Sequence, residues 1–175
     1  PADTMPKYIT IENLEVRGAY QGYQFTNAAG QLQTYAINAA PIYVEKAENL
    51  TVRNCIITDG GNGLFIGSSD TDTSRNILVE GNYIYGNGNS GSAFEHNNYT
   101  AAIGIVFQYN RFGPLRSGSV GVGLKDRSAG TVIRYNWIEG GNRNIDLVDG
   151  EDSILIRNDP NYHKTFVYGN VLIKQ

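Results

Sequence analysis

Short apolar runs alternate with segments rich in glycine, asparagine and other polar residues along the whole chain. Several of these runs place an apolar residue at every second position. The pairs with this spacing are Ile42 and Val44, Leu64 and Ile66, Val122 and Leu124, and Ile145 and Leu147. Alternation with period two is typical of β-strands that bury one face. The pattern therefore predicts an all-β protein in which these alternate positions point into a core.

One short phrase of six residues recurs along the chain. Its first and sixth positions are apolar, its third is Gly, Tyr or Asn, and its fourth is usually Asn. Its second and fifth positions accept any residue. It reads VRNCII from Val52, VEGNYI from Val79, FQYNRF from Phe107, IRYNWI from Ile133 and VYGNVL from Val167, with a weaker copy, IENLEV, from Ile11. From Val52 onward the copies begin 27, 28, 26 and 34 residues apart. A period of this length is a signature of solenoids. A meander of antiparallel hairpins is the alternative, but it does not require the same corner phrase at a fixed spacing.

Each phrase predicts a strand, a two-residue corner and a second strand. Asparagine tolerates a left-handed backbone, and glycine before it removes steric hindrance. Stacked corners would align Asn82, Asn110, Asn136 and Asn170 in a hydrogen-bonded ladder, with Asn54 or Cys55 in the preceding coil. Two inward stripes follow from the same register. They are Val52, Val79, Phe107, Ile133 and Val167, and Ile57, Ile84, Phe112, Ile138 and Leu172.

A further strand precedes each phrase, so each coil is expected to contain a first sheet followed by the two strands of the phrase. The chain then forms about five to six coils of a parallel β-helix, as one domain over residues 1–175. The coil that contains Phe107 is irregular, and its first strand is expected within 94–100. Both ends fall in mid-coil, and solenoid ends normally need caps. We therefore expect a fragment of a longer solenoid, or ends covered by end-to-end self-association.

Charge and hydropathy exclude two classes of partner. The formal net charge is -3 and the pI is about 5.3, whereas nucleic-acid binding needs clustered positive charge. No apolar run approaches the ~18 residues that cross a membrane. The first residues, PADTMPKYITIENL, lack the charged start and apolar run of a signal peptide.

Three stretches carry a family resemblance: IYVEKAENLTVRNCIITDGGNGLFIGSS, EHNNYTAAIGIVFQYNRFGPLR and KDRSAGTVIRYNWIEGGNRNIDLVDGEDS. They resemble right-handed parallel β-helix repeat proteins of the pectate-lyase-like superfamily, especially secreted bacterial members that degrade polysaccharides. The resemblance covers nearly the whole chain from Tyr8 and is specific for fold. It is weak for activity, because this fold hosts many activities. It implies an acidic polysaccharide as partner and a secreted or periplasmic location. The paired Asp motifs of polygalacturonase-type hydrolases are not evident.

The resemblance also implies that sugar chains bind along the outer face of the first sheet. Insertions at 20–40, 68–76, 86–98 and 156–164 are expected to gather on one side and build a cleft there. Lys125 and Asp146 would face outward on adjacent coils, about 4.8 Å apart. Loop residues Asp126 and Arg127 would flank that face.

A uronic-acid polymer cleaved by β-elimination suits these residues. The reaction needs a base beside the sugar carboxylate and positive charge for the enolate-like intermediate. Lys125 is the preferred base if Arg127 lowers its pKa, with His96 or Tyr99 as alternatives. The candidates for binding the substrate carboxylate and the rest of the sugar are Arg127, Arg143, Glu95, Asn97 and Asn98.

Four acidic residues form a candidate Ca²⁺ site, because this ion takes six to eight oxygen ligands. They are Asp146, Asp149, Glu151 and Asp152. Simpler interpretations stay open. The Lys125–Arg127 segment could be a solvated turn, DGED is a common loop composition, and EHNNY could satisfy an irregular backbone. Tyrosines 83, 85, 109 and 135 favour stacked packing rows over a sugar platform.

The leading functional hypothesis is a polysaccharide lyase that acts by β-elimination on a uronic-acid polymer. The alternative is a non-catalytic β-helix segment, truncated or engineered, that binds carbohydrate or serves a structural role. The fold alone does not separate these two classes.

Overall fold

Three parallel sheets and one antiparallel hairpin make up the strands of the computed structural model, which describes residues 4–174. Sheet 1 contains β5 (Ile42–Val44), β8 (Leu64–Ile66), β11 (Asn98–Thr100), β14 (Val122–Asp126) and β17 (Arg143–Leu147). Sheet 2 contains β1 (Lys7–Glu12), β6 (Glu48–Arg53), β9 (Arg75–Glu80), β12 (Ile103–Gln108), β15 (Thr131–Arg134) and β18 (Thr165–Tyr168). Sheet 3 contains β2 (Glu15–Arg17), β7 (Ile56–Thr58), β10 (Tyr83–Tyr85), β13 (Arg111–Phe112), β16 (Trp137–Glu139) and β19 (Val171–Ile173).

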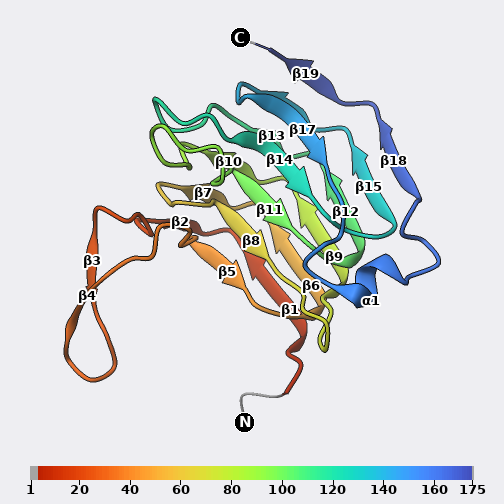
Figure 1. Cartoon of the computed structure of the whole chain (residues 1–175). Coiled ribbons are helices and arrows are strands. Elements are labelled where there is room, and N and C mark those ends of the chain that lie inside the picture. The colour runs from red at the N-terminus through yellow and green to blue at the C-terminus, as the bar shows by residue number, and fades with distance from the viewer. Residues whose placement is uncertain (1–3, 175) are drawn as a thin grey trace.

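The chain passes from sheet 1 to sheet 2 to sheet 3 in every full coil, and the coils stack along one axis (Figure 1). The strand order gives five complete coils, β5–β7 to β17–β19, after a partial coil of β1 and β2. Neighbouring coils pair in parallel, with Val52 opposite Val79 and Phe107 opposite Ile133. The predicted β-helix of about five to six coils is confirmed.

The asparagine ladder lies at the corner between sheets 2 and 3. The backbone N–H groups of Asn82, Asn110 and Asn136 each donate to the Oδ1 of the next ladder residue, at 3.0, 3.0 and 2.9 Å. The side-chain amides donate to the same oxygens at 3.0, 2.9 and 3.0 Å. Cys55 N–H donates to Asn82 Oδ1 at 3.0 Å, so Cys55 rather than Asn54 occupies the preceding ladder position.

The left-handed backbone lies one residue earlier than the sequence suggests. Gly81, Tyr109, Tyr135 and Gly169, which precede the ladder residues, have φ of 64°, 57°, 56° and 66°. No ladder asparagine has a positive φ. The preceding residue makes the turn, and the asparagine can then direct its side-chain amide toward the next coil of the solenoid. Glycine or tyrosine therefore accepts the strained conformation in place of asparagine.

The two predicted stripes line the core through most of the solenoid. Val52, Val79, Phe107 and Ile133 are fully buried, as are Ile57, Ile84, Phe112 and Ile138. Val167 and Leu172 in the last described coil are instead 45% and 51% exposed, because β18 and β19 pair with one neighbour each. Leu147 is 47% exposed for the same reason, since β17 is also an edge strand of its sheet, although its register partner Asp126 points into the core.

Asp126 belongs to the core and not, as predicted, to a loop beside the outer face. Its carboxylate accepts hydrogen bonds from the hydroxyls of Thr100, Ser128 and Thr131, at 2.7, 2.7 and 2.6 Å. Burial raises the pKa of this carboxyl group, while the three hydroxyl donors act in the opposite direction. The irregular coil thus continues through a polar interior, where Thr100 pairs in register with Asp126.

The insertions lie on two edges of sheet 1, and the expectation that they gather on one side is wrong. The edge between sheets 3 and 1 bears the hairpin of β3 (Gln24–Thr26) and β4 (Leu32–Thr34), which projects as an arm from the solenoid (Figure 1). Arg116 stacks 3.9 Å from the centre of the Tyr20 ring at the base of this arm.

The opposite edge of sheet 1, toward sheet 2, bears the 148–164 loop with α1 (Ile154–Arg157). Ile156 packs against Ala101 and Ala129, whose small side chains leave room for it. Ser153 Oγ donates to the Ser69 carbonyl at 2.6 Å, which ties this loop to the 68–72 turn. Loops therefore flank sheet 1 along both of its edges, the one toward sheet 3 and the one toward sheet 2. No helix within residues 4–174 is long and apolar enough to span a membrane.

Replacing Asn110 with alanine should destabilise the fold by about 2–4 kcal/mol, because buried N–H groups of Asn82 would lose their acceptor. The measurement is the free energy of unfolding in denaturant. Asn170→Ala is the matched control. Its ladder bonds are only partly buried, so water can replace them and the loss should be smaller. Equal losses would contradict the role of burial.

Asp126→Asn should change how stability depends on pH. The folded pKa of Asp126 is raised, so the protonated carboxyl stabilises the fold at low pH and this contribution is lost as pH rises through the folded pKa. The free energy of unfolding of the natural chain, relative to Asp126→Asn, should therefore fall as pH rises above about 4. A difference that stays constant from acid to neutral pH would contradict the raised pKa.

Candidate functional site

A single column of side chains runs across the outer face of sheet 1. Tyr43, Phe65, Tyr99, Lys125 and Asp146 are consecutive partners in register, one from each coil. The ring centres of Tyr43 and Phe65 are 4.5 Å apart and those of Phe65 and Tyr99 are 5.4 Å apart, with nearly parallel planes. Lys125 Nζ lies 5.2 Å from the centre of the Tyr99 ring. The predicted placement of Lys125 and Asp146 on one outer face is confirmed.

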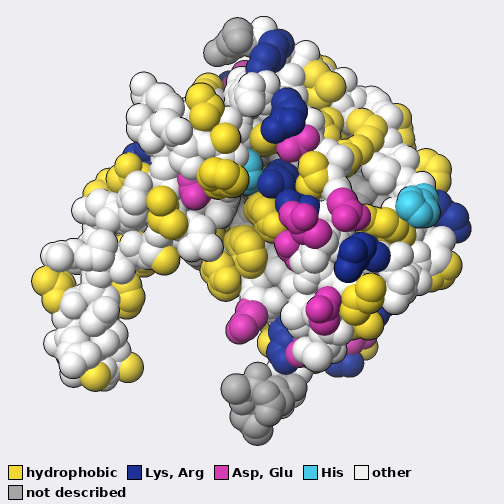
Figure 2. All heavy atoms as spheres, in the orientation of Figure 1, with side chains coloured by type: hydrophobic (Ala, Val, Ile, Leu, Met, Phe, Trp, Pro, Cys, Tyr) yellow, Lys and Arg dark blue, Asp and Glu magenta, His cyan; other side chains and the backbone are white. Residues whose placement is uncertain are grey.

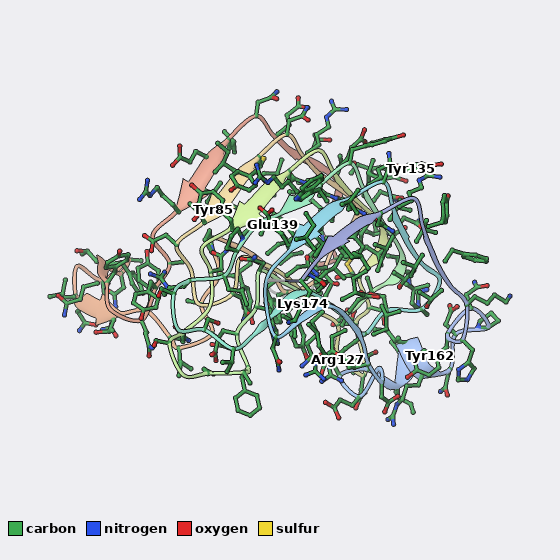
Figure 3. All side chains as sticks on the ribbon, turned by 90° about the horizontal axis from the view of Figure 1, so that it is seen from above. Tyr85, Arg127, Tyr135, Glu139, Tyr162 and Lys174 are labelled. Atoms are coloured by element: carbon green, nitrogen blue, oxygen red, sulfur yellow. The ribbon has the colours of Figure 1, made fainter. Side chains whose placement is uncertain are left out.

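Tyr43 and Phe65 were missed by the sequence interpretation. Their signal is present, because each occupies the outward position between two inward residues, Ile42 and Val44 or Leu64 and Ile66. The tyrosines singled out from the sequence lie elsewhere. Tyr83 stacks on Tyr85 with ring centres 4.3 Å apart, and Tyr109 stacks on Tyr135 at 5.6 Å. Figure 3 places Tyr85 and Tyr135 on the side of the solenoid away from Arg127.

The column forms the floor of a hollowed face. Figure 2 shows hydrophobic side chains in this hollow, between the projecting arm and an edge with acidic and basic side chains. At the end near β5, a pocket of about 520 Å³ is lined by Tyr43, Phe65, Lys46, Ser69 and Asp72, among others. A Lys46–Asp72 ion pair with a 3.1 Å separation lies in this pocket. The face thus changes from aromatic at β5 and β8 to charged at β14 and β17.

Lys125 is the candidate base with the most suitable surroundings. Partial burial lowers its pKa, and the positive charge of Arg127 lowers it further, while Asp146, Asp152 and Glu151 act in the opposite direction. A lowered pKa increases the fraction of neutral amine that can accept a proton. Lys125 is also only partly buried.

Arg127 is held by its own loop and is not free to bind a substrate carboxylate. Its side chain is 10% exposed, and Nη2 lies 2.7 Å from Glu151 Oε1. Nε donates to the Tyr99 hydroxyl at 2.8 Å, and Nη1 donates to the Asp149 carbonyl. Its predicted role as a carboxylate ligand is therefore corrected: Arg127 fixes the 149–152 segment and places positive charge beside Lys125.

Tyr99 is unsuited to act as a base. Its hydroxyl donates to Asp152 Oδ2 at 2.6 Å. Burial raises the pKa of the phenol, and the hydrogen bond to Asp152 raises it further. The phenol therefore stays protonated at neutral pH. Arg143 is more accessible: its side chain is 59% exposed, and its Nε lies 3.5 Å from Asp146 Oδ1.

His96 is buried beside this charged region. Its Nδ1 accepts the backbone N–H of Val122 at 3.0 Å. Burial lowers its pKa to about 3, with further lowering by Lys125, Arg143 and Arg127. The imidazole is neutral at pH 7, but the lone pair that a base would use is already engaged. The prediction of His96 as a base is therefore wrong for this geometry.

Three further predicted substrate contacts lie in the interior. Glu95 is 4% exposed, and Asn97 and Asn98 are fully buried. Asn97 Nδ2 donates to the Gly113 carbonyl at 2.8 Å, and Asn98 Nδ2 donates to Thr100 Oγ1 at 3.2 Å. These predictions are wrong because the irregular coil turns the EHNN segment inward, where it satisfies backbone and side-chain groups.

The four acids predicted to bind Ca²⁺ are engaged with different partners. Asp149 accepts from the Tyr162 hydroxyl, Glu151 and Asp152 face Arg127, and Asp146 faces Arg143. Within residues 4–174, no three His, Cys, Asp or Glu side chains are grouped as metal ligands. Each of these acids is engaged by an arginine or a hydroxyl in this structure, and calcium binding stays a prediction.

Tyr99→Phe should loosen the loop that walls this face. The change removes hydrogen bonds to Asp152 and Arg127 and leaves the aromatic stack in place. We expect faster amide hydrogen exchange in residues 148–157, measured by mass spectrometry. Tyr43→Phe is the matched control, because its hydroxyl has no hydrogen bond within residues 4–174. Unchanged exchange in Tyr99→Phe would show that the loop is held by other contacts.

Comparison with known proteins bears on the fold. A family model described as the right-handed beta helix region matches residues 6–171. No curated protein and no solved structure matches the chain. The match extends over nearly the whole chain and agrees with the three stacked parallel sheets. The chain therefore belongs to the right-handed β-helix family.

Proposed function

We propose that the chain is a polysaccharide lyase that binds a uronic-acid polymer across sheet 1 and cleaves it by β-elimination. The family supports the coarser part of this proposal, because many β-helix proteins act on carbohydrates. The observation that carries the finer part is the position of Lys125: it lies in the outer column with a lowered pKa, next to Tyr99 and opposite Asp146.

The column suits an extended sugar chain that runs along the helix axis. Successive coils are about 4.8 Å apart, which is comparable to the length of one sugar residue. Tyr43, Phe65 and Tyr99 overlap partly, so the row offers an apolar strip of ring edges and uncovered ring surface. Arg143 adds positive charge at the other end, where a sugar carboxylate would bind.

The elimination needs a proton acceptor and charge stabilisation at one sugar. Neutral Lys125 takes the C5 proton next to the carboxylate, the C4–O bond of the glycosidic link breaks, and a C4–C5 double bond forms. The departing oxygen is protonated by the Lys125 ammonium or by water. Arg143 stabilises the negative charge that develops on the carboxylate. Such a polymer lies outside the cell, so we also propose a secreted or periplasmic location.

A second candidate function is carbohydrate binding without turnover. The observation that favours it is the engagement of Tyr99 and Arg127 in a structural network, which leaves Lys125 as the remaining base among the predicted candidates. Binding needs the column but no base. The two functions therefore differ in what they require of Lys125.

Incubation with polygalacturonate, alginate and chondroitin sulfate, each with and without Ca²⁺, tests the proposal. A lyase releases products whose new double bond absorbs in the ultraviolet. Lys125→Ala should lower this rate by about 10²-fold or more, which is typical for loss of a general base. Lys164→Ala is the matched control, because Lys164 contacts Asn161 in an exposed loop.

Each outcome separates the two functions. Binding of a polymer in affinity electrophoresis without product would favour the non-catalytic function. Full activity of Lys125→Ala would contradict the assigned base. Neither binding nor product with any of the three polymers would contradict both functions.

A further inference from the structure

The imidazole of His96 has an unusual hydrogen-bonding state. Its Nδ1 accepts the Val122 N–H at 3.0 Å, so Nδ1 carries no proton. A neutral imidazole has one protonated nitrogen, and in His96 that nitrogen must be Nε2. His96 Nε2 is buried and has no hydrogen-bond partner within the described residues. His96 therefore presents an unsatisfied N–H donor.

Such an orphaned donor calls for an explanation, because buried polar groups in folded proteins nearly always find a partner. Four other buried side-chain atoms also lack a hydrogen-bond partner within the described residues: Thr73 Oγ1, Asn89 Oδ1, Glu95 Oε2 and Asn98 Oδ1. The charged groups that act on the His96 ring are Lys125, Arg143 and Arg127, and all three are positive.

The ring of His96 lies close to the outer column. Its centre is 6.1 Å from that of Tyr99, with an angle of 15° between the planes. Tyr99 in turn lies under Lys125. Of the three cations, Arg127 pairs with Glu151 and Asp152, and Arg143 pairs with Asp146, whereas Lys125 has no ion-pair partner within residues 4–174. An oxygen atom that reached Nε2 would therefore approach a cation that no carboxylate pairs with. That environment favours a negatively charged oxygen over a neutral hydroxyl.

We propose that His96 binds a carboxylate oxygen of the ligand through its Nε2–H group, in a subsite shared with Lys125 and Arg143. The inference rests on the proposed function, since it names the part of the groove that recognises the acidic sugar. His96 is then a neutral hydrogen-bond donor and not a base. Nε2 is shielded from water in the free chain, so a neighbouring side chain must move for the ligand to enter. Lys125 is the flexible neighbour.

The proton position is tested first by ¹⁵N NMR of the histidine ring in the full chain. We expect the proton on Nε2 and no titration of the ring between about pH 5 and pH 8, where an ordinary histidine changes charge. A proton on Nδ1, or titration with an ordinary midpoint, would overturn the inference.

Ligand binding is tested with tetragalacturonate and its carboxyl-reduced neutral counterpart, or with the same pair prepared from alginate or chondroitin sulfate if one of those binds. The acidic oligomer should shift the Nε2 resonance of His96, and the neutral one should not. An unshifted resonance at saturation with the acidic oligomer would overturn the inference.

His96→Asn separates binding from structure. Its side-chain oxygen can still accept the Val122 N–H, but it places no donor where Nε2 lies. We expect the melting temperature to be retained and the affinity for the acidic oligomer to fall about 10-fold or more, as for loss of a hydrogen bond to a charged group. His96→Gln, which restores a donor near that position, should recover part of the affinity. Unchanged affinity of a folded His96→Asn variant would overturn the inference.

The failure of the proposed function would be recognised separately. If no acidic polymer binds the natural chain, that function fails, and sodium acetate replaces the oligomer as the probe, with sodium chloride as control. A saturable shift of the Nε2 resonance by acetate alone would support the carboxylate subsite. The absence of such a shift would overturn it.

Discussion

The whole structure depends on the register in which one coil stacks on the next. Parallel pairing in three sheets provides hydrogen-bond partners for the backbone N–H and C=O groups of the strands. The asparagine ladder provides partners at the corner between sheets 2 and 3. The side-chain oxygens of Asn110, Asn136 and Asn170 each accept both a backbone and a side-chain N–H from the preceding ladder residue, so a slip of one residue would break two bonds at each of these corners. Equivalent residues of successive coils therefore lie directly above one another, and their side chains form straight columns.

The candidate site is a consequence of that register. Tyr43, Phe65, Tyr99, Lys125 and Asp146 are far apart in the sequence but are neighbours on the outer face of sheet 1. Loops at both edges of the sheet then set the chemistry of the column. The 148–164 loop brings Glu151 and Asp152 to Arg127. These ion pairs hold the Arg127 guanidinium in place, and its positive charge stays beside Lys125.

Most of the fold could be predicted from the sequence by itself. The recurring phrase identified the solenoid, the ladder at Asn82, Asn110, Asn136 and Asn170, and both inward stripes. It also placed Lys125 and Asp146 on one face. These features follow from local alternation and from a period repeated in every coil, and both properties are present in the linear order of residues.

The state of each site residue was decided only by the tertiary structure. The irregular coil turns Asn97 and Asn98 inward, and no period in the sequence marks that change. Asp126, in the next coil, continues the inward alternation of Val122 and Leu124, and its hydroxyl partners from Thr100, Ser128 and Thr131 are visible only in the structure. The 148–164 loop engages Arg127 and Tyr99, and the Val122 N–H engages Nδ1 of His96. Burial, tautomer and pKa depend on which groups meet across coils. The sequence therefore determined the scaffold and the location of the site on it. The packing of loops against that scaffold determined which side chains are free to act there.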